Sequence, residues 1–142
     1  MHHKRLVIDA NILIRAVLGN RVRNLLETYC ENVAFYVAEA NADEAKFYLF
    51  NVLATKHNLS SGLCGSIFDS VLNIVQVIPD HMLSEMEIKA KARIKARDIN
   101  DWPVVATALL LECPIWTEDQ DFFGSGVATW TTTTVELYLA ES

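Results

Sequence analysis

Four carboxylates stand at separated places in the chain, each beside strongly apolar sequence. Asp9 follows the apolar residues 6–8, Glu44 lies in "NADEAKF", Asp101 opens "DWPVVATAL", and Asp119 lies in "WTEDQDF". A charge is seldom buried without a partner, and like charges that meet in one cleft are unstable unless a cation offsets them. Carboxylate oxygens are the ligands that hard divalent cations prefer. If the fold brings these acids together, the chemistry open to them is binding of Mg²⁺ or Mn²⁺.

No competing set of metal ligands stands out in the sequence. The three cysteines, Cys30, Cys64 and Cys113, are odd in number and lack C-x-x-C spacing, so neither a disulfide framework nor a zinc site is indicated. They fit the role of small core hydrophobes. The histidines also lack ligand spacing, which leaves the carboxylates as the candidate ligands.

Each acid also has an ordinary structural explanation. Asp9 and Asp101 stand where the N-cap of a following helix is expected, Glu44 would suit a solvated helix face, and Asp119 would suit a turn. For a single acid these explanations are the more common ones. Four such acids in one α/β frame favour a shared site instead.

The elements that must position these acids are visible as alternating apolar patterns. Short apolar runs typical of buried strands occur at residues 5–8, 33–38, 75–78 and 114–117, with a weaker one at 127–130. Helical spacing of apolar residues is found at residues 10–18, 21–32, 41–56, 60–74, 87–97, 101–112 and 133–140. Strands that alternate with helices predict a parallel sheet covered on both faces.

We therefore expect an α/β fold of three layers, α/β/α, with a central, mostly parallel sheet of four to five strands. The composition shows no linker or repeat, so a single domain over residues 1–142 is expected. In such sheets ligands bind beyond the carboxyl ends of the strands, where the chain order reverses. Asp9 and Asp119 both follow the carboxyl end of a predicted strand.

One detail of this assignment rests on competing signals. Residues 87–97 alternate polar and apolar with period two, as a strand would, but they are rich in Ala, Lys and Arg, which favour a helix. We therefore expect a helix there. The aromatic residues that fit core positions are Phe47, Phe50, Trp116 and Trp130.

The net charge of −6 and the pI of about 5.1 do not indicate an extended basic surface for nucleic acid. Among the cations, Arg15, Arg21 and Arg23 follow Asp9 closely and are the candidates for contacts with a phosphate backbone. The longest apolar run, residues 103–111, is far below the roughly 20 residues that span a bilayer, and no signal-peptide pattern is present. We expect a cytoplasmic protein without membrane contact.

Taken together, the four acidic segments resemble those of the PIN-domain nuclease family. The resemblance covers nearly the whole chain and rests on the order and spacing of "VIDANIL", "DEAKFYL", "RDINDWPVVATAL" and "WTEDQDF". It implies a compact α/β fold with a central parallel sheet and a metal-dependent nuclease site that usually acts on RNA. Many small bacterial members are toxins of toxin–antitoxin pairs, so the resemblance also implies an antitoxin protein and a homodimer as partners.

Position by position, the resemblance places the family's four acids on Asp9, Glu44, Asp101 and Asp119. It implies that Asp9, Asp101 and Asp119 hold Mg²⁺ or Mn²⁺ directly or through water, with Asp9 as the central ligand. Glu44 would orient the attacking water.

Three further residues are expected to support the site. Asn11 matches the small polar residue two places after the first acid, and Thr117 matches the hydroxyl two places before the last. Asp121 is expected in the first turn of a short helix, as a cap or supporting group, because free N–H groups favour a carboxylate there. Asp121 is also the alternative to Asp119. Other acids close enough in sequence to be alternatives are Glu39 and Asp43 for Glu44, and Asp98 for Asp101.

The function expected from these residues is metal-dependent hydrolysis of phosphodiester bonds in RNA. One alternative is a non-catalytic module of the same fold, against which the complete set of acids weighs. Another is a phosphotransfer domain, since receivers and haloacid-type phosphatases also place an Asp after a strand. Receivers need an acidic pair upstream and a later Lys, and the phosphatase pattern needs a second Asp where this chain has Asn11.

Overall fold

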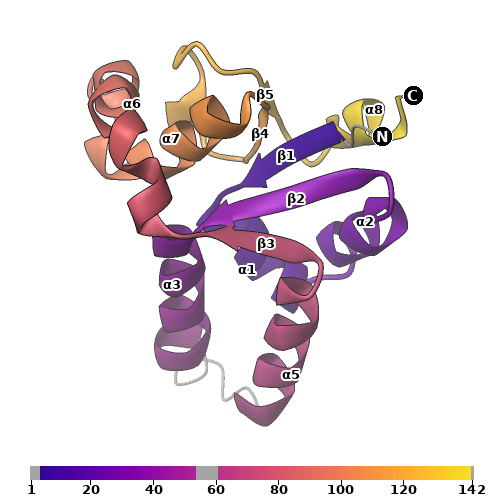
Figure 1. Cartoon of the computed structure of the whole chain (residues 1–142). Helices are drawn as coiled ribbons and strands as arrows, with labels where there is room; N and C mark the ends of the chain where they lie inside the picture. The colour runs from indigo at the N-terminus through magenta and orange to yellow at the C-terminus, as the bar shows by residue number, and fades with distance from the viewer. Residues whose placement is uncertain (1–3, 54–60, 142) are drawn as a thin grey trace.

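Five short runs rich in β-branched and aromatic residues form one parallel sheet. In the computed structural model, which describes residues 4–53 and 61–141, the strands are β1 Lys4–Ile8, β2 Val33–Ala38, β3 Val75–Ile78, β4 Ile115–Trp116 and β5 Thr129–Trp130. Their order in the sheet is β3-β2-β1-β4-β5, and each pairing is parallel (Figure 1). The predicted central sheet is therefore confirmed.

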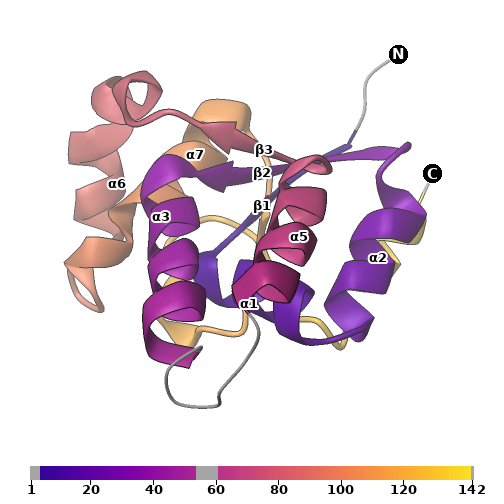
Figure 2. The ribbon, with the colours of Figure 1, turned by 90° about the horizontal axis from the view of Figure 1, so that it is seen from below.

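Helices cover both faces of this sheet. In the described ranges the α-helices are α1 Ala10–Leu18, α2 Arg21–Tyr29, α3 Glu39–Phe47, α5 Ser61–Leu72, α6 Glu87–Ile94, α7 Trp102–Leu111 and α8 Val135–Ala140. One face packs on α1, α2, α3, α5 and α8, and the other packs on α6 and α7 (Figure 1, Figure 2). None of these helices is long and apolar enough to cross a membrane. The predicted α/β/α layering is confirmed.

Strand β1 shows how the sheet divides the core. Leu6 and Ile8 are fully buried with the side chains of α1 and α2, while Val7 between them is fully buried on the opposite face with those of α7. Successive side chains of a strand point to opposite faces, so a strand covered on both sides must be apolar throughout. This explains why residues 6–8 are apolar without interruption and why charges stand only at the two ends of the strand, at Lys4 and Arg5 before this run and at Asp9 after it.

The chain reverses direction across β1. It proceeds outward from β1 through β2 and β3, and then returns to the opposite side of β1 with β4 and β5. Ile8 pairs with Trp116 at the carboxyl ends of β1 and β4, so the next residues, Asp9 and Thr117, emerge side by side. Such a reversal point is where α/β sheets commonly bind ligands.

Several helices differ from their predicted boundaries. Helix α2 ends at Tyr29 and not at residue 32, α5 ends at Leu72 and not at residue 74, and α8 begins at Val135 and not at residue 133. The helix expected from residue 41 begins at Glu39 and continues into a π-helical segment, Tyr48–Leu53. Its expected end at residue 56 lies outside the described residues, as does the expected start of the next helix at residue 60. The helix expected at 87–97 is present but ends at Ile94.

The predicted core position of Phe47 is wrong, because its side chain is 63% exposed. The inward face of α3 carries the small residues Ala42 and Ala45 instead. Trp116 is fully buried, and Phe50 and Trp130 pack against the same core, as predicted. Small residues on the inner face let α3 lie close to α1, which brings the exposed side of α3 near the carboxyl end of β1.

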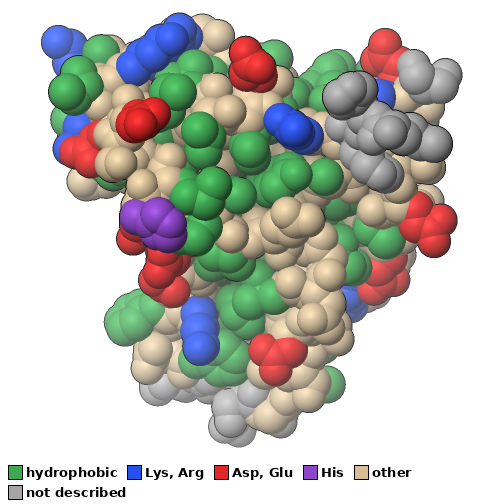
Figure 3. All heavy atoms as spheres, in the orientation of Figure 1, with side chains coloured by type: hydrophobic (Ala, Val, Ile, Leu, Met, Phe, Trp, Pro, Cys, Tyr) green, Lys and Arg blue, Asp and Glu red, His purple; other side chains and the backbone are tan. Residues whose placement is uncertain are grey.

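The sheet ends at an edge strand, β3, on the face drawn in Figure 3. Hydrophobic side chains gather in a band across the middle of this face, and Val77 of β3 is 39% exposed. A shallow groove of about 470 Å³ lies between β3, α3 and α5, and it is lined on the α3 side by Glu39, Asp43 and Lys46. One exposed face of α3 therefore belongs to this groove and not to the reversal point of the sheet.

Two glycines provide a matched test of the fold. Gly126 has a φ of +84° and lies against Arg93, whose guanidinium donates to the Ser125 carbonyl at 3.0 Å. We expect Gly126→Ala to lower the free energy of unfolding by about 1–2 kcal/mol, because an L side chain is strained at this φ. Gly65→Ala in α5 should raise it by about 0.5–1 kcal/mol, since the added methyl meets only the Phe50 ring at 3.9 Å.

Urea unfolding of both variants measures these changes. Equal stability of Gly126→Ala and the wild type would show that this loop does not hold the left-handed backbone described here.

Candidate functional site

Asp9 is both the buried end of β1 and the N-cap of α1. Its side chain is only 4% exposed. Oδ1 accepts a hydrogen bond from the Ile12 N–H at 2.9 Å, and Oδ2 accepts one from the Thr117 hydroxyl. The ordinary cap role is thus present, but the second bond also holds the carboxylate toward β4. The start of one helix and the ends of two strands determine where this charge lies.

A chain of hydrogen bonds orders the segment after β4. The buried Thr117 hydroxyl accepts the Asp119 N–H at 2.9 Å, and Asp119 Oδ1 accepts the Asp121 N–H at 2.9 Å. Asp119 therefore caps the 3₁₀ turn Gln120–Phe122. Asp121 lies in the first turn, as expected, but the cap predicted for it is supplied by Asp119.

The segment before α7 brings two more acids together. Asp98 accepts the Asn100 N–H at 3.0 Å and caps the 3₁₀ turn Ile99–Asp101. Residues three apart lie over one another in such a turn, which places Asp101 beside Asp98. One oxygen each from Asp98, Asp101 and Asp121 lie within 4.8 Å of one another. These acids come from segments on either side of α7.

Asp101 is the acid of this group with a buried oxygen that accepts no hydrogen bond among the described residues. It stands at the N-cap position of α7, as predicted, but within the described residues its side chain makes no capping hydrogen bond. Its Oδ2 atom is buried and has no hydrogen-bond partner among the described residues. A buried carboxylate oxygen without a donor is costly, and a bound cation would remove that cost.

Glu44 is the acid of α3 that the fold brings to this place. It lines the same cleft as Asp119, and its charge interacts with those of Asp9 and Asp98. Glu39, in contrast, accepts the Asp80 N–H at 2.9 Å, and with Asp43 it lines the groove beside β3.

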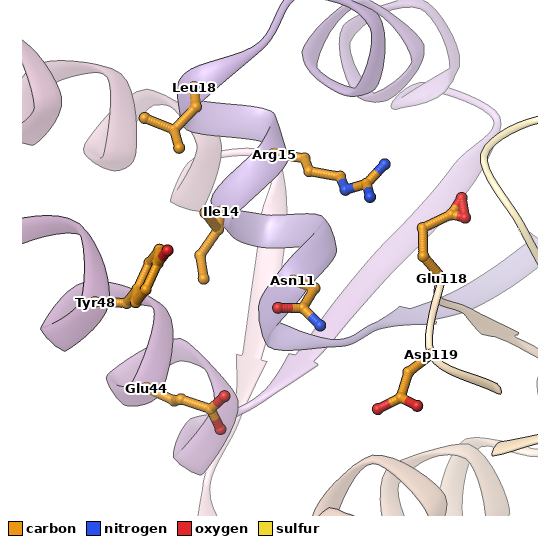
Figure 4. A pocket seen from close by; sticks show the side chains of 8 residues that line it. All are labelled: Asn11, Ile14, Arg15, Leu18, Glu44, Tyr48, Glu118 and Asp119. Carbon is orange, nitrogen blue, oxygen red and sulfur yellow. The ribbon is translucent and has the colours of Figure 1, made fainter. Parts of the chain in front are cut away.

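Of these acids, Glu44 and Asp119 line an open cleft of about 670 Å³ over the exposed stripe of α1. In Figure 4, α1 forms the floor, Glu44 and Tyr48 lie on one side, and Glu118 and Asp119 lie on the other. The side chains of Glu44, Asn11 and Asp119 converge near the start of α1. The lining residues are Asn11, Ile14, Arg15, Leu18, Glu44, Tyr48, Glu118 and Asp119.

Burial and mutual repulsion oppose ionisation of these acids. Burial raises the pKa of Asp9 from 3.8 to about 6, although the hydrogen bonds from Thr117 and Ile12 act in the opposite direction. Burial, and then the charge of Asp98, raises the pKa of Asp101 from 3.8 to about 7. The same two causes raise the pKa of Glu44. Near neutral pH these carboxylates repel one another, and a bound positive charge would relieve that repulsion.

The donor set suits a hard divalent cation. In residues 4–53 and 61–141 the one Lys or Arg ion pair joins Lys91 to Glu87, so no protein cation neutralises the acids of the cleft. The oxygens within 4.8 Å of one another belong to Asp98, Asp101 and Asp121, and carboxylate oxygens are the ligands that Mg²⁺ and Mn²⁺ prefer. Among the described residues, Asp9 and Asp119 are not part of that group, although their charges act on Asp101. The unpartnered Oδ2 of Asp101 is the observation in this structure that fits such an ion.

The three arginines expected to contact phosphates lie in different places. Arg15 lines the cleft, and its guanidinium forms no hydrogen bond or ion pair within the described part of the chain. Arg21 donates to the Thr132 carbonyl, and Arg23 donates to the carbonyls of Ala16 and Val17 at the end of α1. Arg21 and Arg23 therefore hold the backbone together, and only Arg15 of the three lies in the cleft.

Two residues of the site received no role from the sequence. Asp98 entered only as an alternative to Asp101, whereas the structure brings both together; the spacing of three residues in "DIND" was the available signal. Glu118 lines the cleft opposite α1, and its Oε1 accepts the Thr132 N–H at 2.8 Å. No pattern in the sequence separates Glu118 from an ordinary turn residue.

Comparison with known proteins bears on the identity of this fold. A family model described as PIN domain matches residues 7–140. The search for relatives among curated proteins gave no match.

Among solved structures, a toxin–antitoxin complex from Klebsiella pneumoniae is 20% identical, with a TM-score of 0.64 over 89% of this chain and 97% of that chain. VapBC2 from Rickettsia felis, bound to a DNA fragment from its promoter, is 13% identical, with a TM-score of 0.66 over 89% and 98%. PAE2754 from Pyrobaculum aerophilum is 17% identical, with a TM-score of 0.69 over 96% and 90%. At these identities the likeness shows the fold.

The raised pKa values generate a prediction about stability without metal. Asp9 and Asp101 have folded pKa values of about 6 and 7, above the ordinary value of 3.8. The native state therefore binds more protons than the unfolded state, and this stabilisation is complete below about pH 4 and is lost as pH rises through 6 to 7. In EDTA, the melting temperature measured by circular dichroism should fall between about pH 5.5 and about pH 8.

Asp101→Asn removes one of these groups and supplies an amide that can donate to the neighbouring carboxylates. The variant should melt above the wild type at about pH 8 and depend less on pH. Asp69→Asn, which changes an exposed acid of α5, is the control and should keep the wild-type pH dependence. A wild-type melting temperature that rises over this pH range would contradict the clustering of these acids.

Proposed function

Because the chain belongs to the PIN-domain family, whose model matches residues 7–140, we propose that it is a Mg²⁺- or Mn²⁺-dependent endoribonuclease. The observation that carries the proposal is the buried, unpartnered Oδ2 of Asp101 among acids from four segments of the chain. Nuclease activity follows from the family and the metal site from the donor set. The RNA substrate and the choice of metal are the finer parts of the proposal.

Asp9, Asp101 and Asp119 are the residues that would hold the ion, directly or through water. Asp9 is the central ligand because Ile12 and Thr117 fix its orientation. Asp98 and Asp121 lie close to Asp101 and would help to hold the ion or orient the residues that bind it. When bound, Mg²⁺ or Mn²⁺ supplies Lewis acidity toward a phosphoryl oxygen and makes nearby water more acidic.

Glu44 is the proposed base that orients the attacking water and takes its proton. Its raised pKa favours proton transfer closer to neutral pH, and it extends toward the start of α1 from the side opposite Asp119. Asn11 lies between these two acids in Figure 4 and donates its amide N–H to a phosphoryl oxygen. Arg15, further along α1, contacts the next phosphate of the strand.

The biological role that fits these residues is that of a toxin in a toxin–antitoxin pair. The solved structures similar in fold include a toxin–antitoxin complex from Klebsiella pneumoniae and VapBC2 from Rickettsia felis. By this reasoning the chain is a single domain that acts in the cytoplasm as a homodimer and binds an antitoxin protein.

Cleavage of a mixed RNA pool tests the activity. The wild type should cleave with Mg²⁺ or Mn²⁺ and be inactive in EDTA. The Asp101→Asn variant should lose activity by roughly 10- to 100-fold or more, because it removes a proposed metal ligand whose Oδ2 accepts no hydrogen bond from the described part of the protein. The Asp69→Asn variant should retain full activity. A well-folded wild-type protein inactive with both metals would favour a non-catalytic module, and cleavage unaffected by EDTA would contradict the metal site.

The dependence of RNA binding on salt tests Arg15. Since the chain carries a net charge of −6 and Arg15 is the one cation among the described residues that lines the cleft, we expect a shallow salt dependence. Arg15→Gln should weaken binding several-fold and reduce the slope of log K against log salt by about 1. Arg21→Gln is the matched control, and its salt slope should equal that of the wild type. An unchanged slope in Arg15→Gln would show that Arg15 does not contact an RNA phosphate.

A further inference from the structure

The cleft has a second half that the proposed chemistry does not use. Four residues of α1 spaced as one helical stripe, at 11, 14, 15 and 18, form its floor. The acids lie at the Asn11 end. Further along, two residues of this stripe, Ile14 and Leu18, form with Tyr48 an apolar surface, which we call the apolar wall (Figure 4). Leu18 is 48% exposed and Tyr48 is 38% exposed. An apolar wall open to solvent directly beside the acids indicates contact with a ligand.

Tyr48 is the aromatic residue of this wall. It stands one turn after Glu44, where α3 passes into the π-helical segment Tyr48–Leu53, a type of irregularity often found at functional sites. Within the described ranges its ring makes no aromatic or cation–π contact and its hydroxyl makes no hydrogen bond. Tyr29 and Tyr138, in contrast, donate hydrogen bonds to Glu136 and to the Arg5 carbonyl. The Tyr48 ring is therefore available for stacking.

We propose that this wall is a subsite for one unpaired RNA base, which stacks on the Tyr48 ring between Ile14 and Leu18. Arg15 extends from the other side of α1, toward Glu118 (Figure 4), and contacts a backbone phosphate next to that nucleotide. The inference rests on the proposed ribonuclease function and names its substrate as single-stranded RNA. A base within a duplex is already stacked and cannot lie on an aromatic side chain, so recognition by stacking selects unpaired segments.

The charge of the protein supports this choice of occupant. With a net charge of −6 and one unpaired guanidinium in the cleft, phosphate contacts alone give little affinity for RNA. Stacking on an aromatic ring adds affinity that does not depend on neutralising phosphates. The cleft of about 670 Å³ lies within the roughly 300–1,000 Å³ of pockets that hold small organic ligands, which include a nucleotide.

Three variants at two adjacent positions test the subsite. Tyr48→Leu removes the ring but keeps an apolar side chain, and Tyr48→Phe keeps the ring. Phe47→Leu makes the same change at the neighbouring aromatic residue, which is 63% exposed and does not line the cleft. Each protein is measured for kcat/KM on a labelled single-stranded RNA with Mn²⁺, and for Kd with Ca²⁺ by fluorescence anisotropy. The same RNA annealed to its complement, and a series with one abasic nucleotide at successive positions, complete the set.

Tyr48→Leu should weaken Kd for the single strand at least about fivefold, and Tyr48→Phe should restore most of it. An abasic nucleotide at one position should weaken wild-type binding similarly and have little further effect on Tyr48→Leu. Phe47→Leu should match the wild type, and the duplex should bind and be cleaved poorly by every protein. The coincidence of the abasic and Tyr48→Leu effects is a result that a merely structural role of Tyr48 would not produce.

Equal Kd values for Tyr48→Leu and Phe47→Leu would overturn the subsite and leave the wall as a surface for a protein segment. Duplex RNA bound or cleaved as well as the single strand would also overturn it. Failure of the ribonuclease proposal looks different: the wild type would bind the single strand through Tyr48 but cleave nothing with either metal. Absence of any binding to the single strand would reject the subsite as well.

Discussion

The hydrogen bond from the Thr117 hydroxyl to Asp9 is the interaction on which the site depends. It joins residues 108 positions apart and is possible only because Ile8 and Trp116 are paired at the ends of β1 and β4. Asp9 also accepts the Ile12 N–H, so the same carboxylate sets the start of α1. Thr117 in turn accepts the Asp119 N–H, which places the next acid. One shared register between two short strands therefore positions the floor of the cleft and the side that carries Asp119.

This arrangement works against the stability of the fold. Asp9 is compensated by two donors, but Asp101 has a buried oxygen with no partner, and burial together with the charge of Asp98 raises its pKa to about 7. Asp101 also stands at the N-cap position of α7 without capping it, although a capping bond there would stabilise the helix. Acids kept in this state indicate a site organised for an external cation, because stability alone would favour neutral or capping side chains.

The sheet could be predicted because each strand is short, apolar and bounded by helical patterns, and because two-sided burial leaves no position for a charge among residues 6–8 of β1. The acids at strand ends followed from the same reasoning. The pairing of Asp98 with Asp101 could not be predicted with confidence, since it depends on a 3₁₀ turn that periodicity does not reveal. Arg21 was assigned to substrate by its nearness in sequence, but the helix break at Gly19 directs it to the Thr132 carbonyl. Backbone carbonyls attract cations as phosphates do, and the sequence does not distinguish the two.

Every residue of helix α1 is either buried in the core or lines the cleft. Four of its residues line the cleft, namely Asn11, Ile14, Arg15 and Leu18, and the remaining five, Ala10, Ile12, Leu13, Ala16 and Val17, are buried. An ordinary surface helix keeps a polar face on which substitutions are nearly neutral, but α1 has no such face. Amino-acid substitution is therefore restricted at every position of α1, at the buried positions by core packing and at the others by the cleft. Reporter groups or affinity tags are better attached to α5 or α6, where exposed positions alternate with buried ones.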